Sequence, residues 1–319
     1  MIDHILVPLD GSELAECVLP HLMAIAPITG ARVTLIHVLE RNLSHNGSAA
    51  PTDPLGWHMQ KQESQSYLDR IAERLQKVDV HVEQAILEGN PAETLIEFAR
   101  TSDADLLLLS THGRTGLSAW NVSSVVQKIL FRSYKSTLLI RAFTSPPDDV
   151  QYHRLFLAID GSARAEYILP FAMSLAQSHQ SNVVLGMVIQ TPQTMQRFPL
   201  SEEDAAWIRE FTEKNQNDAS RYLEQLATQL SLKDVPAQTK IVVSENAPGA
   251  VYDMAEESDA DLIMIAAHGA SGERRWPYGS IASSLIAYGR TPLMILQDLA
   301  ENEIPHAHAE RALREAKGR

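Results

Sequence analysis

The chain has 319 residues, more than one hydrophobic core usually holds, so we expect two domains of about 150 residues each. Its 27 Lys and Arg against 40 Asp and Glu give a formal net charge of −13, which argues against nucleic acid and anionic membranes as partners. A single cysteine excludes an internal disulfide and a CxxC metal or redox site. The first apolar run ends at Asp10 without a signal-peptide pattern, and no stretch of about 18 apolar residues occurs, so we expect a cytoplasmic protein.

The first predicted element is a buried strand at residues 5–9, followed by Asp10-Gly-Ser and the start of a helical pattern. The same arrangement returns at residues 155–159, where a second apolar run ends in Asp160-Gly-Ser. Residues 10–26 and 160–176 share nine identities in seventeen aligned positions. The chain is therefore one unit written twice.

Short apolar runs rich in Val, Ile and Leu alternate with segments of helical period, such as residues 64–77, a pattern typical of parallel strands buried on both faces. In chain order, the predicted strands are 5–9, 32–39, 78–87, 105–110 and 137–142 in the first copy, and 155–159, 182–189, 239–244, 261–266 and 292–297 in the second. The motif "SDADL", at residues 102–106 and 258–262, repeats at a larger offset than Asp-Gly-Ser does. We expect the extra residues in the loop before the second helix of the second copy.

These patterns predict an α/β protein of two doubly wound, five-stranded parallel-sheet domains. The predicted domains are residues 1–146 and 152–299, joined near the proline-containing stretch 144–151, with a C-terminal tail at 300–319. Ligands of such sheets bind beyond the carboxyl ends of the strands, where the strand order reverses. If strands one and four are neighbours in each copy, Asp-Gly-Ser and His-Gly face the same crevice.

The residues after the first and fourth strands are the candidates for a binding site. Asp10 and Asp160 could cap the following helix or contact a ribose or a metal ion, and the sequence leaves these two roles equally open. After the fourth strand of the second copy, Gly269 is followed by nine residues and then by Gly279 and Ser280 at the start of a helix. Backbone amides at a glycine turn and a helix N-terminus bind anions, and loop residues 274 and 275, both arginine, could close over a phosphate.

At this point the chain resembles the universal stress protein family, whose nucleotide-binding members carry Gly-x-x-Gly-(nine residues)-Gly-Ser/Thr after the fourth strand. Here that pattern reads Ser110-x-x-Gly113-x9-Ser123-Ser124 and Ala266-x-x-Gly269-x9-Gly279-Ser280. Both copies lack the first glycine and the first copy also lacks the third, so the second copy is expected to be the main site. The resemblance implies an adenine nucleotide alpha hydrolase-like fold, an internal pseudo-dimer in which the last strands of the copies pair, and ATP as the ligand, with Mg²⁺ as a candidate bridging ion.

The resemblance also implies the contact residues. In the second copy they are Ala158, Ile159, Asp160, Val188, Ile265, Ala266, His268, Gly269, Gly279, Ser280 and Ile281, with the backbone of Val188 meeting adenine. In the first copy they are Pro8, Leu9, Asp10, Val38, Leu109, Ser110, Gly113, Ser123, Ser124 and Val125. For His112 and His268, a ring that packs or bonds locally to orient the turn is the preferred interpretation over a phosphate contact.

The function expected from these residues is binding of ATP or a related adenine nucleotide in a stress response, without catalysis. No P-loop, GxGxxG or GxSxG motif occurs, which argues against P-loop hydrolases, dinucleotide oxidoreductases and serine hydrolases. One alternative is a degenerate stress protein whose pockets are empty and whose surfaces recruit an unknown protein partner. Another is an enzyme that cleaves the α–β phosphate bond, which usually shows a Ser-Gly-Gly turn after the first strand. Association of two chains stays open.

Overall fold

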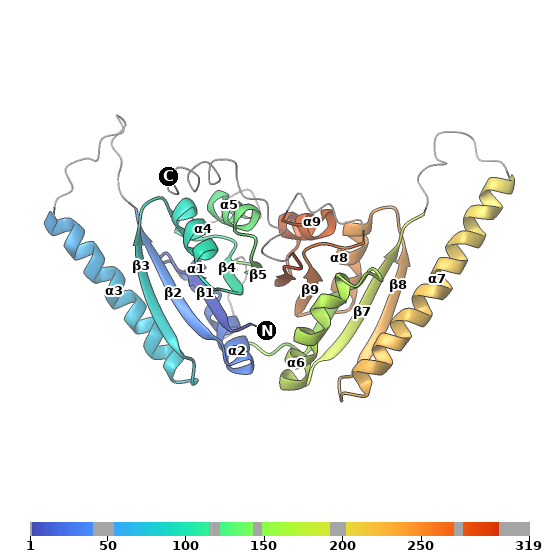
Figure 1. Cartoon of the computed structure of the whole chain (residues 1–319), viewed down its shortest axis with the longest axis horizontal. Helices are drawn as coiled ribbons and strands as arrows, with labels where there is room; N and C mark the ends of the chain where they lie inside the picture. Colours follow the sequence, from blue (N-terminus) through green and yellow to red (C-terminus); the bar gives the residue numbers. More distant parts are fainter. Residues whose placement is uncertain are drawn as a thin grey trace, which may run out of the picture.

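The computed structural model describes residues 2–40, 54–114, 116, 122–142, 149–191, 202–270 and 277–299. Its centre is a ten-stranded sheet with the order β3-β2-β1-β4-β5-β10-β9-β6-β7-β8, in which the second five strands mirror the first five (Figure 1). Neighbouring strands are parallel throughout, except at the middle, where β5 and β10 run antiparallel. The predicted α/β fold of two doubly wound five-stranded units is confirmed.

The elements follow the repeat. The first contains β1 (His4–Pro8), α1 (Glu13–Glu16), α2 (Leu19–Thr29), β2 (Arg32–Leu39), α3 (Pro54–Gln76), β3 (Val82–Glu88), α4 (Pro91–Thr101), β4 (Leu106–Ser110), α5 (Ser124–Ser133) and β5 (Ser136–Ile140). The second contains β6 (Arg154–Ala158), a 3-10 turn η1 (Ala165–Ile168), α6 (Leu169–His179), β7 (Asn182–Ile189), α7 (Glu202–Ser231), β8 (Ala237–Val243), α8 (Ala247–Glu257), β9 (Leu262–Ala266), α9 (Ser280–Tyr288) and β10 (Leu293–Leu296).

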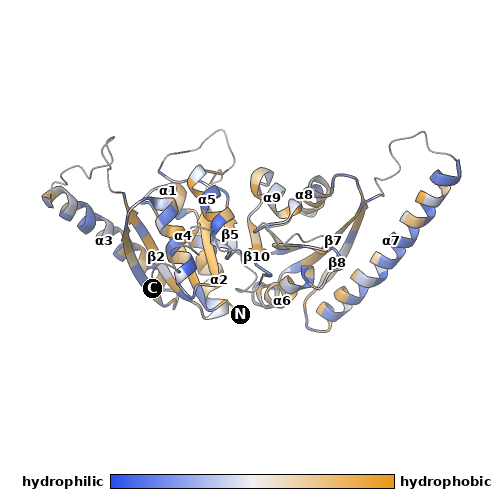
Figure 2. Cartoon of the chain, turned by 45° about the horizontal axis from the view of Figure 1, so that its top comes forward, coloured by the Kyte–Doolittle hydropathy of each residue, from blue (hydrophilic) through white to orange (hydrophobic). Residues whose placement is uncertain are grey.

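Helices cover both faces of the sheet, so the inner strands bury side chains on two sides, whereas the edge strands β3 and β8 are only partly buried. One core cluster joins α2, α3, α6 and α7 to the sheet, and the other joins α4, α5, α8 and α9 to the opposite face. In Figure 2 the strands are mostly orange, whereas the outer helices α3 and α7 carry blue along much of their length. Burial on both faces explains why the strands read as continuous apolar runs rather than alternating ones.

The strand order reverses beside β1 and beside β6. β1 pairs with β2 on one side and with β4 on the other, and β6 pairs in the same way with β7 and β9. Strands one and four of each repeat are therefore neighbours, as the site prediction required. The loops that follow them leave the same edge of the sheet at the point where ligands of such sheets bind.

The two repeats join through their last strands and form an internal pseudo-dimer. Leu293 pairs with Leu139, and Ile295 pairs with Thr137, so the sheet continues from one repeat into the other. Behind this seam, Nδ1 of His21 lies 2.7 Å from the buried Tyr152 hydroxyl, and His179 contacts the Tyr152 ring edge-on. The expected pairing of the last strands is confirmed.

Two boundary predictions are wrong. β3 begins at Val82 rather than at residue 78, because residues 77–79 form a turn in which Asp79 has a φ of 59°. The extra residues of the second repeat lie mainly in its long helix and not in the preceding loop, since α7 has 30 residues and α3 has 23. The N-terminal half of α7 extends away from the sheet (Figure 1).

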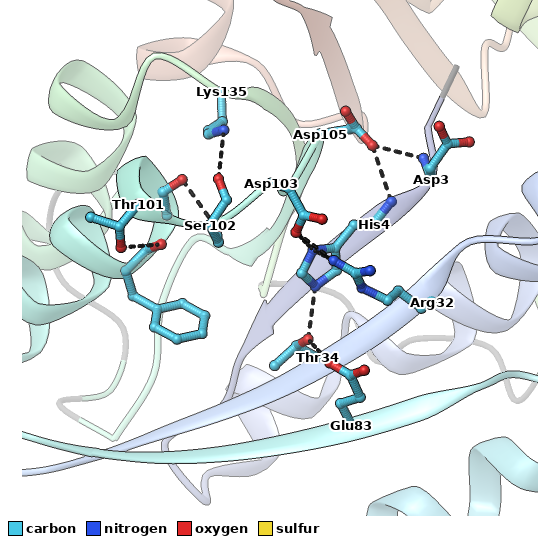
Figure 3. A network of polar contacts seen from close by, with 12 residues as sticks. Asp3, His4, Arg32, Thr34, Glu83, Thr101, Ser102, Asp103, Asp105 and Lys135 are labelled. Atoms are coloured by element: carbon cyan, nitrogen blue, oxygen red, sulfur yellow. Dashed lines mark hydrogen bonds and ion pairs between the residues drawn. The ribbon is translucent and has the colours of Figure 1, made fainter.

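The repeated "SDADL" motif has a structural role at the amino edge of the sheet, opposite the candidate site. Asp105 Oδ2 accepts hydrogen bonds from the backbone amides of Asp3 and His4, and Asp261 Oδ2 accepts the corresponding pair at the start of β6. Figure 3 shows this edge in the first repeat, where Asp103 also binds His4 and Arg32. These aspartates fasten the first strand of each repeat to the fourth.

Within the described residues, every helix is either too short or too polar to cross a lipid bilayer. The predicted tail at residues 300–319 and the junction residues 143–148 lie outside the described residues.

Candidate functional site

In the second repeat, Asp160 ties the loop after β6 to the loop after β9. Its Oδ1 accepts hydrogen bonds from the Ser162 amide at 2.9 Å and the Ser162 hydroxyl at 2.6 Å, and its Oδ2 accepts one from the Ala270 amide at 2.6 Å. A Cβ at Gly269 would overlap Asp160 Oδ2, so this position requires glycine. The carboxylate is exposed at the surface, so it remains accessible to a ligand while it holds the two loops together.

The first repeat has the same connection and one more. Asp10 accepts from the amide and hydroxyl of Ser12 and from the Arg114 amide, and a Cβ at Gly113 would overlap its carboxylate. In addition, Nη2 of Arg114 donates to the Asp10 carbonyl at 2.7 Å. The residue after the turn glycine in the second repeat is Ala270, which has no such side chain. Among the described residues, the position after the turn glycine therefore places an arginine over the aspartate loop in the first repeat and an alanine there in the second.

The helix starts also differ between the repeats. Ser123 Oγ accepts a hydrogen bond from the Val126 amide at 3.4 Å, so α5 is capped by its own side chain. At the equivalent position in α9, Gly279 has no side chain to cap the helix, and its amide donates to the Ala267 carbonyl at 2.7 Å. The next residue, Ser280, is exposed. The N-terminal turn of α9 is thus arranged to give amides and a hydroxyl to an anion.

The residues that replace the first motif glycine point toward the helix after the first strand. Ser110 Oγ donates to the Leu14 carbonyl at 2.7 Å and receives a hydrogen bond from Cys17 Sγ at 3.3 Å. Ala266 is buried in the core cluster formed with α6. Burial raises the pKa of the Cys17 thiol, so this cysteine is held in its unreactive form. Neither replacement places its side chain at the start of α9 or α5.

Sequence reasoning missed a buried charge cluster behind the turn of the second repeat. The amide and Nδ1 of His268 lie 3.0 and 2.7 Å from Asp298 Oδ1, and Arg164 Nη1 lies 3.4 Å from Asp298 Oδ2. In the first repeat, Ala142 takes the register position of Asp298, and His112 Nδ1 lies 3.1 Å from the Thr111 hydroxyl. Both rings are buried, which favours the interpretation that they orient the turn. The repeated stretch from the SDAD motif to the His-Gly turn could not predict a role for Asp298, because Asp298 lies beyond the last strand.

The other predicted contact residues lie at the same carboxyl edge. Val38 and Val188 are half-buried near the ends of β2 and β7. The first strands end at Pro8 and Leu9 and at Ala158 and Ile159, while the fourth strands carry the buried Leu109 and Ile265. Among the residues that begin the last helices, Ser124 and Val125 are exposed and Ile281 is half-buried. The structure thus brings the predicted residues of each repeat to one edge, whereas loop residues 274 and 275 lie outside the described residues.

The described residues contain no cluster of three or more His, Cys, Asp or Glu side chains arranged to hold a metal ion.

Together, the sheet order and the paired loops define a tandem α/β protein in which each half brings the loops after its first and fourth strands to the carboxyl edge of the sheet. The sequence profile of the universal stress protein family matches residues 1–141 and again residues 151–297. The chain belongs to the universal stress protein family, as a tandem member with two copies of the family's unit.

Curated relatives agree with this assignment, and solved structures share the fold. Universal stress protein MJ0531 of Methanocaldococcus jannaschii is 28% identical over 137 residues, which are 43% of this chain and 81% of that protein. MJ0577 of the same organism is 26% identical over 155 residues, covering 44% of this chain and 96% of the relative. Among solved structures, a universal stress protein from Archaeoglobus fulgidus has a TM-score of 0.65 and 16% identity, covering 92% of this chain and 98% of its own. A functionally unknown protein, PA1789 of Pseudomonas aeruginosa, has a TM-score of 0.64 and 14% identity over 98% of both chains.

Proposed function

We propose that this protein binds ATP or a related adenine nucleotide, chiefly in the second repeat, and acts in a stress response through its bound state rather than by rapid turnover. The phosphates would lie on the turn formed by Gly269, Gly279 and Ser280. The ribose would lie near Asp160, and the adenine near the backbone of Val188. This assignment combines the family's motif with the chemistry of the carboxyl edge.

The observation that carries the proposal is the uncapped start of α9. Gly279 leaves the first-turn amides of the helix without a side-chain acceptor of its own, and Ser280 beside it is exposed. The positive end of the helix dipole adds to the attraction for a phosphate. A glycine turn, an exposed hydroxyl and a helix N-terminus at a strand-order switch are together suited to a nucleotide polyphosphate.

Two contacts make the first repeat the weaker candidate. Ser123 already caps α5, and Arg114 covers the Asp10 loop. A phosphate at that turn would have to displace the serine cap and would gain fewer amides in return. We therefore propose one principal nucleotide per chain.

The role proposed for Asp160 is a double one. It accepts two hydrogen bonds from Ser162 in its own loop and one from Ala270 in the loop after β9, and its exposed carboxylate would accept a ribose hydroxyl. Mg²⁺, if bound with ATP, would be held mainly by phosphate oxygens and water. Because the carboxylate is already engaged by the protein, it is suited to positioning and less suited to act as a catalytic base.

Mass spectrometry of ligand extracted from freshly purified protein tests the proposal. We expect an adenine nucleotide in the wild type and reduced occupancy in Gly279→Val, since valine side-chain atoms would occupy the space in front of the helix start. Ser124→Val is the matched control, because it alters the corresponding turn of the first repeat. Absence of any extracted adenine nucleotide, together with no binding when ATP is added, would contradict the proposal and support a protein-recruiting role.

A further inference from the structure

The helix that begins at the proposed phosphate turn is held by the other repeat at both of its ends. α9 has only nine residues, with Ala282, Leu285 and Ile286 buried. Its last turn contains no basic residue of its own. In Figure 1, α5 and α9 face each other across the middle of the molecule, above the seam where β5 pairs with β10.

At the C-terminal end, Arg141 of the first repeat supplies the missing positive charge. Its Nη1 donates to the Ile286 carbonyl at 3.0 Å, and its Nη2 donates to the Leu285 carbonyl at 2.7 Å. A cation at this position stabilises a helix by neutralising its negative end. The side chain is only 3% exposed, and burial lowers the pKa of Arg141 to about 10, so the guanidinium stays charged at neutral pH.

Gly289 makes this approach possible. A Cβ there would lie 2.6 Å from the Leu285 carbonyl oxygen and 3.1 Å from Arg141 Nη2. The Gly289 amide also donates to the Leu285 carbonyl at 2.9 Å. The end of α9 is therefore shaped around a side chain that comes from the other half of the chain.

At the N-terminal end, Tyr278 makes the second contact. This residue immediately precedes Gly279, is 4% exposed, and packs edge-on against Phe131 of α5 with the ring centroids 5.9 Å apart. The proposed phosphate turn is thus one residue from a contact with the first repeat.

The reverse arrangement differs. Gln297 of the second repeat occupies the register position of Arg141, because Leu296 pairs with Ala266 as Ile140 pairs with Ser110. The side-chain Nε2 of Gln297 donates to the Pro277 carbonyl of its own repeat at 3.2 Å, while its backbone amide donates to the Ser136 hydroxyl of the first repeat at 3.0 Å. Arg141 therefore stabilises the end of α9, the helix with the Gly-Ser start. Its counterpart in the second repeat, Gln297, makes different contacts.

We propose that Arg141 is a positioning residue for the anion site of the second repeat, so that the first repeat controls phosphate affinity there without binding the nucleotide itself. This inference rests on the proposed function. Arg141 fixes the carbonyl end of α9, and a helix of nine residues transmits any shift or fraying at that end to the amides that face the phosphate. Nucleotide binding to the second repeat is therefore coupled to the seam at which β5 pairs with β10.

Equilibrium binding of ATP and of adenosine to the full chain tests this role. In Arg141→Gln we expect ATP affinity to fall about tenfold, in the range expected for loss of a buried cation at a helix C-terminus. Adenosine affinity should change less than twofold, since adenosine has no phosphate group that could contact the N-terminal amides of α9. Arg141→Lys keeps the charge and should recover part of the ATP affinity. Arg221→Gln, which removes an exposed arginine from α7, is the matched control and should leave both affinities unchanged.

Equal loss of ATP and adenosine affinity in Arg141→Gln would overturn the inference, because it would show general damage to the fold. Unchanged ATP affinity in that variant would also overturn it and would leave the proposed function intact. A wild-type chain that binds neither ligand would instead remove the proposed function itself. Should Arg141→Gln fail to fold, the comparison of Arg141→Lys with the wild type decides the same question.

Discussion

The turn before α5 and the turn before α9 come from one duplicated sequence, but the two helix starts differ, because a serine side chain caps α5 whereas α9 begins after a glycine. Both keep the aspartate that ties two loops together and the glycine that this aspartate requires. They differ in the residues that would face a phosphate, where Ser123 caps its own helix and Gly279 does not. The contacts that build the fold have been retained in both halves, whereas those that would bind a ligand have diverged.

The largest effect is expected from disrupting a contact that both repeats share, the close approach of the aspartate carboxylate to the turn glycine. Gly269→Ala would force a methyl group into Asp160, and we expect the free energy of unfolding to fall by about 3 kcal/mol, as for other severe steric changes. Urea denaturation of the full chain measures it. In the double variant Asp160→Ala with Gly269→Ala the overlap is gone, so the loss should be less than the sum of the two single losses. Wild-type stability in Gly269→Ala would show that the loops are not held as described.

The next prediction concerns a buried position at which the two repeats differ. His21 of the first repeat aligns with Phe171 of the second. Burial lowers the pKa of His21 to about 4, from an unfolded value of about 6.5, so the unfolded chain binds a proton that the folded chain does not. This histidine's part of the stability is complete above pH 6.5 and falls as the pH drops toward 4. Between pH 7 and 5 the loss should be about 2 kcal/mol.

His21→Phe removes this titration together with the contact to the Tyr152 hydroxyl. The variant should be less stable than the wild type at pH 7, because a buried hydroxyl loses its neighbour, but the difference should shrink at pH 5. Urea denaturation at the two pH values gives both differences, and groups common to the two proteins cancel. A difference that stays constant with pH would show that His21 does not titrate in this range.

A smaller effect is expected when the start of α9 is given the serine that caps α5. Gly279→Ser introduces the residue found at Ser123, and a Cβ there meets its nearest neighbour, the Ala267 carbonyl oxygen, at an ordinary 3.5 Å. The new hydroxyl can cap α9 and compete with a phosphate, so ATP affinity should fall about tenfold, or about 1.4 kcal/mol. Fluorescence titration with a labelled ATP analogue measures it. Unchanged affinity would mean that the helix start does not contact the phosphates.

The smallest effect is expected from the reverse change, Ser123→Gly. Replacing a serine cap by glycine should lower the free energy of unfolding by only a few tenths of a kcal/mol. It should not create a second ATP site, because Arg114 still covers the aspartate loop of the first repeat. A new binding event of similar affinity would show that Ser123 alone distinguishes the halves.

Much of the fold follows from the sequence because duplication makes each pattern visible twice. The apolar runs predicted the strands, and the neighbouring positions of β1 and β4 were required for the site and are observed. The boundary errors are local. Asp79 adopts a left-handed conformation and ends the turn before β3, but the alternating pattern around it resembles a strand. The added residues of α7 have a helical composition, so the sequence does not show that the helix is longer there.

The site was predictable where a motif has regular spacing, as at Gly269 and Gly279. The contacts that depend on side chains from distant segments were not. Asp298 reaches His268 from beyond the last strand, and Arg141 reaches α9 from the other repeat. The first contact arises from the pairing of β10 with β9 and the second from the pairing of β5 with β10, and neither pairing leaves a periodic signal near these residues.

Calorimetric titration of ATP into the full chain tests most directly whether the second repeat holds the nucleotide. We expect about one ATP bound per chain, with loss of that site in Gly279→Val and its retention in Ser124→Val. Two equivalent sites per chain, or a single site that survives Gly279→Val and disappears in Ser124→Val, would contradict the account.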